Sequence, residues 1–188
     1  MKRIILFAVA ILMMSTALMA QKNESGIKWL SIDELQVKMK EKPKRVYVDM
    51  YTDWCGWCKK MEATTFTNPD VIKYMNDNYY CVRFNAERKD VIYFMGKQYA
   101  FDPEKKMNSL AAQWIGPRVS YPTSVFMEQF YQSPMPVPGY QDVKGMELLV
   151  RFFNEVSVKS QAQWDNYQKT FKPSWASNDG PVTAPAGH

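Results

Sequence analysis

Hydrophobic and polar positions along the chain follow helical and strand periods in turn. The first helix is predicted where Ser31 and Glu34 have the spacing of a capping box, ahead of an apolar stripe that ends before Pro43. Short apolar runs, which are typical of buried strands, cover 46–51, 79–84 and 124–127. Further helices are predicted from near Cys55 to Phe66, after the Asn68–Pro69 pair, from Asp102 through Trp114, and over 142–158.

The order of these elements predicts an α/β fold. Three alternating prolines, Pro134, Pro136 and Pro138, place their missing N–H groups on one side of a strand, which suits only the edge of a sheet. Strand–helix–strand units then indicate a mixed sheet covered by helices on both faces. Residues 88–101 interrupt this alternation, and we expect an ordered insertion there that includes a helical turn.

Both ends of the chain are predicted to lie outside the folded domain. Two basic residues precede an eleven-residue apolar run over 4–14, and Ala20 ends a segment of small residues. This pattern is typical of a secretory signal peptide over 1–20. A retained membrane anchor is the alternative, although a spanning helix needs about 20 apolar residues. We assign 21–159 to one domain and expect 160–188 to be a largely disordered extension.

Composition removes several classes of function. The 188 residues contain 24 Lys plus Arg, 19 Asp plus Glu, three Cys and one His, which is the C-terminal His188. A single terminal His argues against zinc enzymes with His ligands and against Ser-His hydrolases. The net charge of +5 falls by two without the signal peptide, and no basic stripe with interleaved aromatics is present, so nucleic acid is not an expected partner.

The remaining chemistry centres on Cys55 and Cys58, which stand in C-x-x-C spacing after a predicted strand and at a helix start. Unpaired N–H groups there stabilise a thiolate. We expect Cys55 to be the exposed attacking thiol, and Cys58, one turn deeper, to resolve the mixed disulfide. The alternatives are two structural core thiols, a copper- or zinc-handling protein, or a zinc ribbon, which needs a second Cys pair. Cys81 is expected to be an inert core thiol.

Two further residues extend this candidate site. Asp49 lies inside an otherwise apolar strand, so its carboxyl group is expected to be buried, with a raised pKa, and able to take and return the Cys58 proton. The alternative is that Asp49 is a structural residue held by hydrogen bonds. Asp53 is a rival candidate for the proton carrier, but its position in the loop before Trp54 favours exposure. Pro122 precedes a strand, and a cis bond there would place the Tyr121 backbone beside the cysteines, free to pair with an extended substrate.

Aromatic and small residues surround the cysteine pair in the sequence. Trp54 and Trp57 are expected to be partly exposed apolar surface for a partner protein, with simple packing as the alternative. Gly56 lets another chain's backbone approach closely. Lys59 and Lys60 either stabilise thiolate charge or form a solvated helix face.

The run VYVDMYTDWCGWCKKME resembles the active-site segment of thioredoxin-fold oxidoreductases, and SYPTSVFM resembles the segment that holds their cis proline. Within that superfamily the chain is similar to extracytoplasmic thioredoxin-like proteins, and to the periplasmic thioredoxin-like domain of thiol:disulfide interchange transporters. The resemblance covers about residues 27–158 and implies a thioredoxin fold. It also implies that Cys55 is the nucleophile, Cys58 the resolving thiol, Asp49 the buried proton carrier and Pro122 the cis proline.

The resemblance implies an extracytoplasmic thiol–disulfide oxidoreductase that reduces protein disulfides. Its partners would be disulfide-containing proteins and an electron donor such as a membrane thiol:disulfide transporter, and the protein would be a monomer without a cofactor. Trp57 replaces the proline common between the two cysteines of thioredoxins, which leaves the direction of electron flow open. A thiol oxidase, or a binding module with a permanent Cys55–Cys58 disulfide, are the alternative functions.

Overall fold

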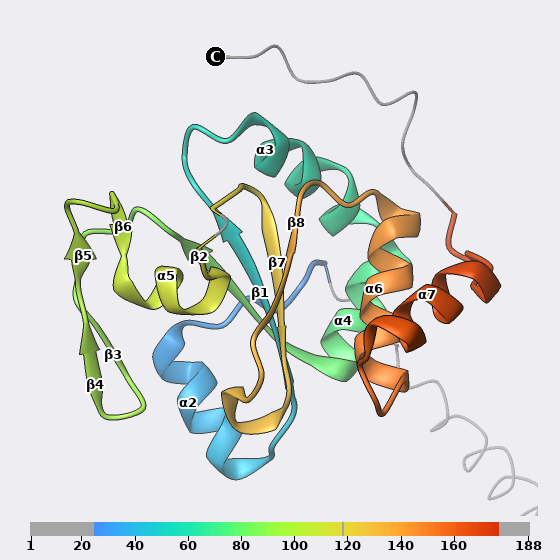
Figure 1. Cartoon of the computed structure of the whole chain (residues 1–188), viewed down its shortest axis with the longest axis horizontal. Coiled ribbons are helices and arrows are strands. Elements are labelled where there is room, and N and C mark those ends of the chain that lie inside the picture. Colours follow the sequence, from blue (N-terminus) through green and yellow to red (C-terminus); the bar gives the residue numbers. More distant parts are fainter. Residues whose placement is uncertain (1–24, 118, 177–188) are drawn as a thin grey trace, which may run out of the picture.

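Four strands form the central sheet of the protein, in the order β2-β1-β7-β8 (Figure 1). The computed structural model describes residues 25–117 and 119–176. β1 pairs with β2 in parallel, whereas the β1–β7 and β7–β8 pairs are antiparallel, so the sheet is mixed as predicted. The strands are β1 (Arg45–Tyr51), β2 (Tyr79–Asn85), β7 (Thr123–Met127) and β8 (Met135–Pro138). The strand that carries alternating prolines, β8, lies at the edge as expected.

Helices cover both faces of this sheet, which confirms the predicted α/β layers. One face packs against α2 (Ile32–Glu41) and α5 (Ser109–Ile115). The other face packs against α3 (Gly56–Ala63), the 3-10 turn η1 (Thr65–Thr67), α4 (Pro69–Asn78) and α6 (Val143–Glu155). A second 3-10 turn, η2 (Gln129–Tyr131), follows β7.

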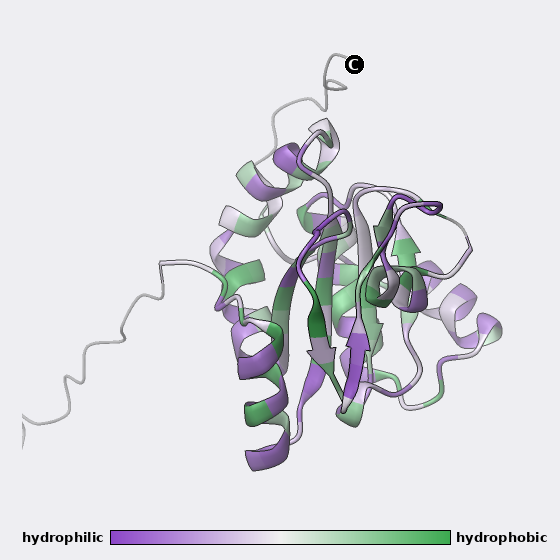
Figure 2. Ribbon diagram, turned by 90° about the vertical axis from the view of Figure 1, so that its left-hand side faces the viewer, coloured by the Kyte–Doolittle hydropathy of each residue, from purple (hydrophilic) through white to green (hydrophobic). Residues whose placement is uncertain are grey.

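Strand β1 shows why one buried strand can serve two cores. Val46, Val48 and Met50 point into the core with α2 and α5, while Tyr47 points into the opposite core, because side chains alternate along a strand. All five of its central residues are buried. Figure 2 shows hydrophobic residues concentrated along the central strands, whereas the helices carry both hydrophobic and hydrophilic residues. Asp49 shares the face of Tyr47, the face that α3 covers.

Two predicted helix starts are confirmed at the level of single hydrogen bonds. Ser31 caps α2 and forms the reciprocal capping box with Glu34. The side chain of Asn68 accepts from the N–H groups of Asp70 and Val71 at the start of α4, where Pro69 takes the first helical position. These side chains satisfy N–H groups that a helix cannot pair internally.

The helix predicted from Asp102 is wrong over its first seven residues, 102–108. The Asp102 carboxylate accepts from the N–H groups of Glu104 and Lys105 and closes a turn instead, and Lys106 then takes a positive φ of 55°. The flanking strands β5 (Phe101–Asp102) and β6 (Met107–Asn108) pair as a hairpin. Helix α5 therefore begins only at Ser109, with Asn108 as its cap.

The insertion predicted over 88–101 is ordered, but it contains a hairpin and no helical turn. β3 (Ile92–Phe94) pairs with β4 (Lys97–Tyr99) across a turn with positive φ at both Met95 and Gly96. Ile92 and Phe94 are buried in the core with α2 and α5. A strand period of two, rather than a helical period, explains why every second apolar residue here faces the core.

Helices α3 and α6 both end earlier than predicted. α3 ends at Ala63, where the Thr64 hydroxyl donates to the Lys60 carbonyl, and Phe66 lies in η1. α6 ends at Glu155.

The C-terminal extension is more ordered than predicted. Helix α7 (Gln161–Thr170) packs Trp164 and Tyr167 against α6. The expectation of a largely disordered extension is therefore wrong for 160–176, and its remainder, 177–188, lies outside the described residues.

The predicted signal peptide and the alternative anchor, over 1–20, also lie outside the described residues. Within 25–117 and 119–176, no helix combines the length and the apolar character that crossing a membrane requires.

Candidate active site

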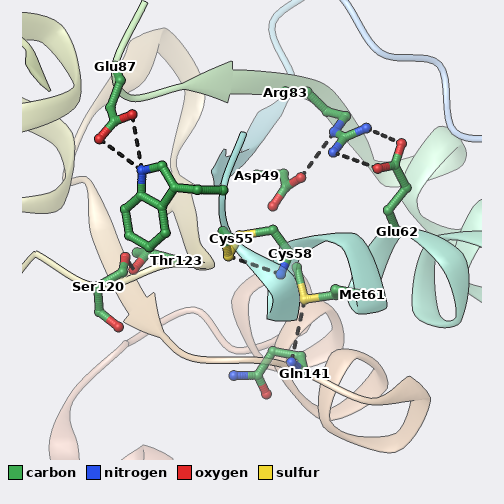
Figure 3. Close-up of a disulfide and its surroundings, with 11 residues drawn as sticks. Asp49, Cys55, Cys58, Met61, Glu62, Arg83, Glu87, Ser120, Thr123 and Gln141 are labelled. Atoms are coloured by element: carbon green, nitrogen blue, oxygen red, sulfur yellow. Dashed lines mark hydrogen bonds and ion pairs between the residues drawn. A yellow bond between two sulfur atoms is a disulfide. The ribbon is translucent and has the colours of Figure 1, made fainter. Parts of the chain in front are cut away.

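Cys55 and Cys58 form a disulfide at the start of α3 (Figure 3). Cys55 is the N-cap residue, and its sulfur accepts the Cys58 backbone N–H at 3.0 Å. The side chains are only 4% and 2% exposed. The expectation of an exposed Cys55 is therefore wrong for the oxidised protein, because its sulfur turns inward to Cys58. The N–H group that it accepts is one of those that would stabilise a Cys55 thiolate after reduction.

Asp49 lies beneath the disulfide, on the same face of β1 as α3, and is 1% exposed. Its Oδ2 accepts from Arg83 Nε at 3.2 Å, whereas its Oδ1 is buried with no hydrogen-bond partner among the described residues. Burial raises the pKa of Asp49 to about 6 from its ordinary value of 3.8, although Arg83 lowers it and the charge of Glu62 raises it. Figure 3 shows the carboxylate between Arg83 and the disulfide.

Arg83 links this buried carboxyl group to the protein surface. It stands directly opposite Asp49 in the β1–β2 register, and its other two nitrogens bind both oxygens of Glu62, which is exposed on α3. The guanidinium also lies 4.7 Å from the Tyr51 ring centroid and 5.8 Å from that of Trp29. Charge, hydrogen bonds and aromatic rings thus fix Arg83 in one position.

The Tyr121–Pro122 peptide bond is cis, as the resemblance implied. The ring of Tyr121 packs edge-on against that of Trp54, with centroids 5.9 Å apart, which brings the segment before β7 next to the residue that precedes Cys55. The Pro122 carbonyl accepts the N–H of Gly139, the glycine with φ of 99° that follows β8.

Trp54 is 63% exposed, and its indole N–H donates to both carboxylate oxygens of Glu87 at 3.1 Å. Trp57 is half-buried and packs on Tyr140, with ring centroids 5.2 Å apart. Gly56 is exposed as the first residue of α3. The two tryptophans therefore contact different partners.

The third cysteine is a core residue, as predicted. Cys81 is 1% exposed in β2, and burial raises the pKa of its thiol far above the ordinary value. Across the described part of the chain, no three Cys, His, Asp or Glu side chains gather as a metal site would require.

The sequence profile of the Thioredox_DsbH family, described as a protein of unknown function (DUF255), matches residues 10–177. The chain belongs to this family. A 48-residue segment of this Thioredox_DsbH protein is also 44% identical to the thiol:disulfide interchange protein DsbD of Escherichia coli strain K12, over 25% of this chain. The match spans only 8% of the length of DsbD.

A solved structure agrees with the family on the fold. A thioredoxin-fold protein from Helicobacter pylori superposes with a TM-score of 0.53 at 16% identity, over 67% of this chain and 80% of that one. A DsbH oxidoreductase gives a TM-score of 0.46 at 17% identity, over 65% of this chain and 80% of that one. The Thioredox_DsbH chain has the thioredoxin fold, and its Cys55–Cys58 pair supports a thiol–disulfide redox role.

The structure therefore brings together Cys55, Cys58 and Asp49, and it connects Trp54 with Tyr121. The sequence analysis did not identify Arg83. A charged residue within the otherwise apolar run 79–84 could have indicated a partner for Asp49. The sequence analysis also missed Glu62, although a residue four positions after Cys58 lies on the same face of a helix. Glu87 gave no signal, because only the folded loop brings it to Trp54.

Proposed function

We propose that this protein reduces protein disulfides through a dithiol–disulfide cycle of Cys55 and Cys58. The observation that carries the proposal is the disulfide at the N-terminus of α3 above a buried carboxyl group with one unpartnered oxygen. A disulfide with a structural role only needs no proton acceptor beneath it. A pair that opens and closes must release and recover a proton at the inner sulfur.

In the proposed cycle the reduced protein supplies two electrons. The Cys55 thiolate attacks one sulfur of a substrate disulfide, forms a mixed disulfide and expels the other substrate sulfur as a thiolate. Asp49 takes the proton of the Cys58 thiol, and the resulting thiolate attacks Cys55 sulfur. The second substrate sulfur leaves as a thiolate and the Cys55–Cys58 disulfide forms. The substrate has gained two electrons, and its two thiolates take up the proton that Asp49 releases and one proton from solvent.

The surroundings of the disulfide suit an extended polypeptide substrate. We assign substrate contact to Trp54, Gly56 and Trp57, and main-chain pairing to Tyr121, next to Pro122. Trp54 supports this assignment because it is 63% exposed and directly precedes Cys55, where an extended substrate would contact it.

We propose the reductive direction because the active-site run resembles reductase-type thioredoxin-like domains. The similarity of 48 residues to the thiol:disulfide interchange protein DsbD supports thiol–disulfide exchange itself. Each turnover leaves the protein oxidised, so a dithiol donor must reduce Cys55–Cys58 again. A membrane thiol:disulfide transporter is the proposed donor. We further propose that the protein acts as a monomer and needs no cofactor.

The test is the equilibrium reduction potential of Cys55–Cys58 in a glutathione series. A value of about −270 mV supports a reductase, whereas a value of about −120 mV indicates a thiol oxidase. Failure of the pair to exchange at all, or of the reduced protein to react with a thiol reagent across pH, indicates a binding module with a permanent disulfide. A Cys58→Ala variant traps the mixed disulfide and identifies the substrate.

We also propose that the protein acts outside the cytoplasm, on the basis of the N-terminal sequence pattern. Cell fractionation with N-terminal sequencing of the purified protein tests this. Cleavage after Ala20 supports the proposal, an intact N-terminus in the membrane fraction indicates a retained anchor, and an intact N-terminus in the cytoplasm overturns it.

A further inference from the structure

An acidic side chain binds the exposed indole that precedes the disulfide. Both carboxylate oxygens of Glu87 bind the Trp54 N–H at 3.1 Å, and the ring of Tyr121 meets the indole at 83°. Asp53, the residue before Trp54, is exposed. A carboxylate that accepts one N–H keeps further lone pairs for other donors. The indole and the Glu87 carboxylate therefore form a surface that attracts a cation, and the exposed Asp53 adds a negative charge at the adjacent residue in the chain.

The fold holds Glu87 firmly in this position. Its N–H donates to the Asn85 side chain at 2.9 Å, and the neighbouring Ala86 is fully buried. Ala86 donates to the Tyr51 carbonyl at 2.8 Å, and its own carbonyl accepts from Asn108 at 2.7 Å. The loop after β2 is thus tied to β1 on one side and to β6 on the other. These backbone hydrogen bonds fix Glu87 beside Trp54.

The basic residues that follow Glu87 are directed elsewhere. The Arg88 guanidinium pairs with both Asp90 oxygens and covers the Phe84 ring. The Lys89 ammonium lies over the Phe101 ring. The negative charge at Trp54 is therefore not cancelled by direct contact with either neighbour.

Basic residues follow Cys58 on α3. The Lys60 ammonium lies 5.6 Å from the Trp57 ring centroid and 5.8 Å from that of Tyr140. Lys59 is exposed on the same turn of α3. Trp54 thus contacts a carboxylate, whereas Trp57 contacts an ammonium group, and such a difference can discriminate among substrates by their charge.

We propose that Glu87 determines substrate specificity by holding Trp54 in place and by selecting disulfides that carry a cationic side chain close to the reacting cysteine. The partner is an extended polypeptide with a Lys or Arg near its disulfide, seated on Trp54 and Glu87. This inference rests on the proposed function, since it concerns the substrates of the same disulfide exchange.

The test uses short peptides whose single cysteine is linked by a disulfide to 5-thio-2-nitrobenzoate. The reduced protein attacks the peptide sulfur and releases the coloured thiolate, so one exchange is followed by absorbance. Lys, Gln or Glu stands two positions before the cysteine in one peptide set and two positions after it in a second set. We expect the Lys peptide of one set to react about threefold faster than its Gln counterpart at low salt. Salt at 0.5 M should remove the difference, because it screens exposed charges.

The decisive variant is Glu87→Gln, which keeps an oxygen that accepts the Trp54 N–H and loses the charge. We expect its Lys-to-Gln rate ratio to fall to about one. Glu41→Gln, an exposed change at the end of α2 and before the opposite end of β1, should keep the ratio of the unmodified protein. The inference is overturned if Glu87→Gln and the unmodified protein have the same Lys-to-Gln rate ratio. It is also overturned if the Lys peptide reacts no faster than the Gln peptide in either set. Failure of every peptide to release thiolate contradicts the proposed function instead.

Discussion

At the residue scale, Asp49 is a carboxyl group placed where water cannot stabilise its charge. One oxygen is paired with Arg83 and the other has no hydrogen-bond partner among the described residues. The apolar run 46–51 was sufficient to predict this burial from the sequence. The partner could not be predicted, because Asp49 and Arg83 are 34 positions apart and meet only through the parallel β1–β2 register.

Replacement of Asp49 by Asn should remove a pH dependence of stability. The folded-state pKa of about 6 lies above the ordinary 3.8, so the folded protein binds this proton more tightly. That stability is fully present below the unfolded value of 3.8, and it is lost as pH rises through about 6. The difference corresponds to about 3 kcal/mol. We therefore expect oxidised Asp49→Asn to be up to about 3 kcal/mol more stable than the unmodified protein at pH 7.5, with a much smaller difference at pH 4.

Urea unfolding at a series of pH values measures this effect. Asp53→Asn is the matched control, because it removes a neighbouring carboxylate that is exposed, and it should follow the unmodified protein. Parallel stability curves for Asp49→Asn and the unmodified protein would show that Asp49 does not titrate in this range.

Replacement of Arg83 by Met should make Asp49 a weaker acid. Arg83 lowers the pKa of Asp49 through its charge and its hydrogen bond, so its loss should raise that pKa above about 6. Fewer molecules then carry an ionised Asp49 at pH 7. We expect the Cys58-dependent release of substrate to slow by about threefold at pH 7 and to recover at pH 9.

Carbon NMR of the Asp49 carboxyl group reads its titration directly, and single-turnover rates give the pH profile. Lys73→Met removes a cation from the exposed Lys73–Asp77 pair of α4 and should leave both curves unchanged. A slower reaction that stays equally slow at pH 9 would mean that Arg83 acts only through the shape of the site.

At the element scale, the helix starts that the sequence predicts correctly are those whose caps are local. Ser31 and Asn68 bind N–H groups two or three residues away, so their patterns are complete in the sequence. The same kind of signal was misleading at Asp102, because an Asp that accepts two following N–H groups closes a turn as readily as it starts a helix. A turn forms here, and not a helix, because Phe101 and Asp102 pair with Asn108 and Met107 in the β5–β6 hairpin.

Asn108→Ala should show how much α5 depends on this junction. The side chain is fully buried, accepts the Leu110 N–H at 2.9 Å and donates to the Asp90 carbonyl. Loss of the cap leaves buried polar groups unpaired, and we expect the free energy of unfolding to fall by about 1–2 kcal/mol. Urea unfolding measures the change, with Asn166→Ala on the exposed side of α7 as the control. Equal losses in the two variants would contradict a structural role for Asn108.

At the scale of the whole molecule, the C-terminal segment joins elements that are distant in sequence. The carboxylate of Glu147, buried in α6, accepts from the N–H and hydroxyl of Ser174 and from the N–H of Trp175. Ala176 accepts from Asn68 at the start of α4. This contact could not be predicted from the sequence, because Glu147 and Ser174 are 27 positions apart and meet only in the folded chain. The segment contributes both hydrogen bonds to α6 and the packing of aromatic rings.

Removal of this segment should therefore destabilise the whole protein. A chain that ends at Thr170 loses the three hydrogen bonds to Glu147 and the packing of Trp175 against Tyr74, with centroids 5.5 Å apart. Arg151 is then the remaining partner of a buried carboxylate. We expect a loss of about 2–4 kcal/mol in urea unfolding. A chain that ends at Ala176 keeps every one of these contacts and should match the full-length protein. If the two truncated chains unfold at the same urea concentration, the segment does not stabilise the fold.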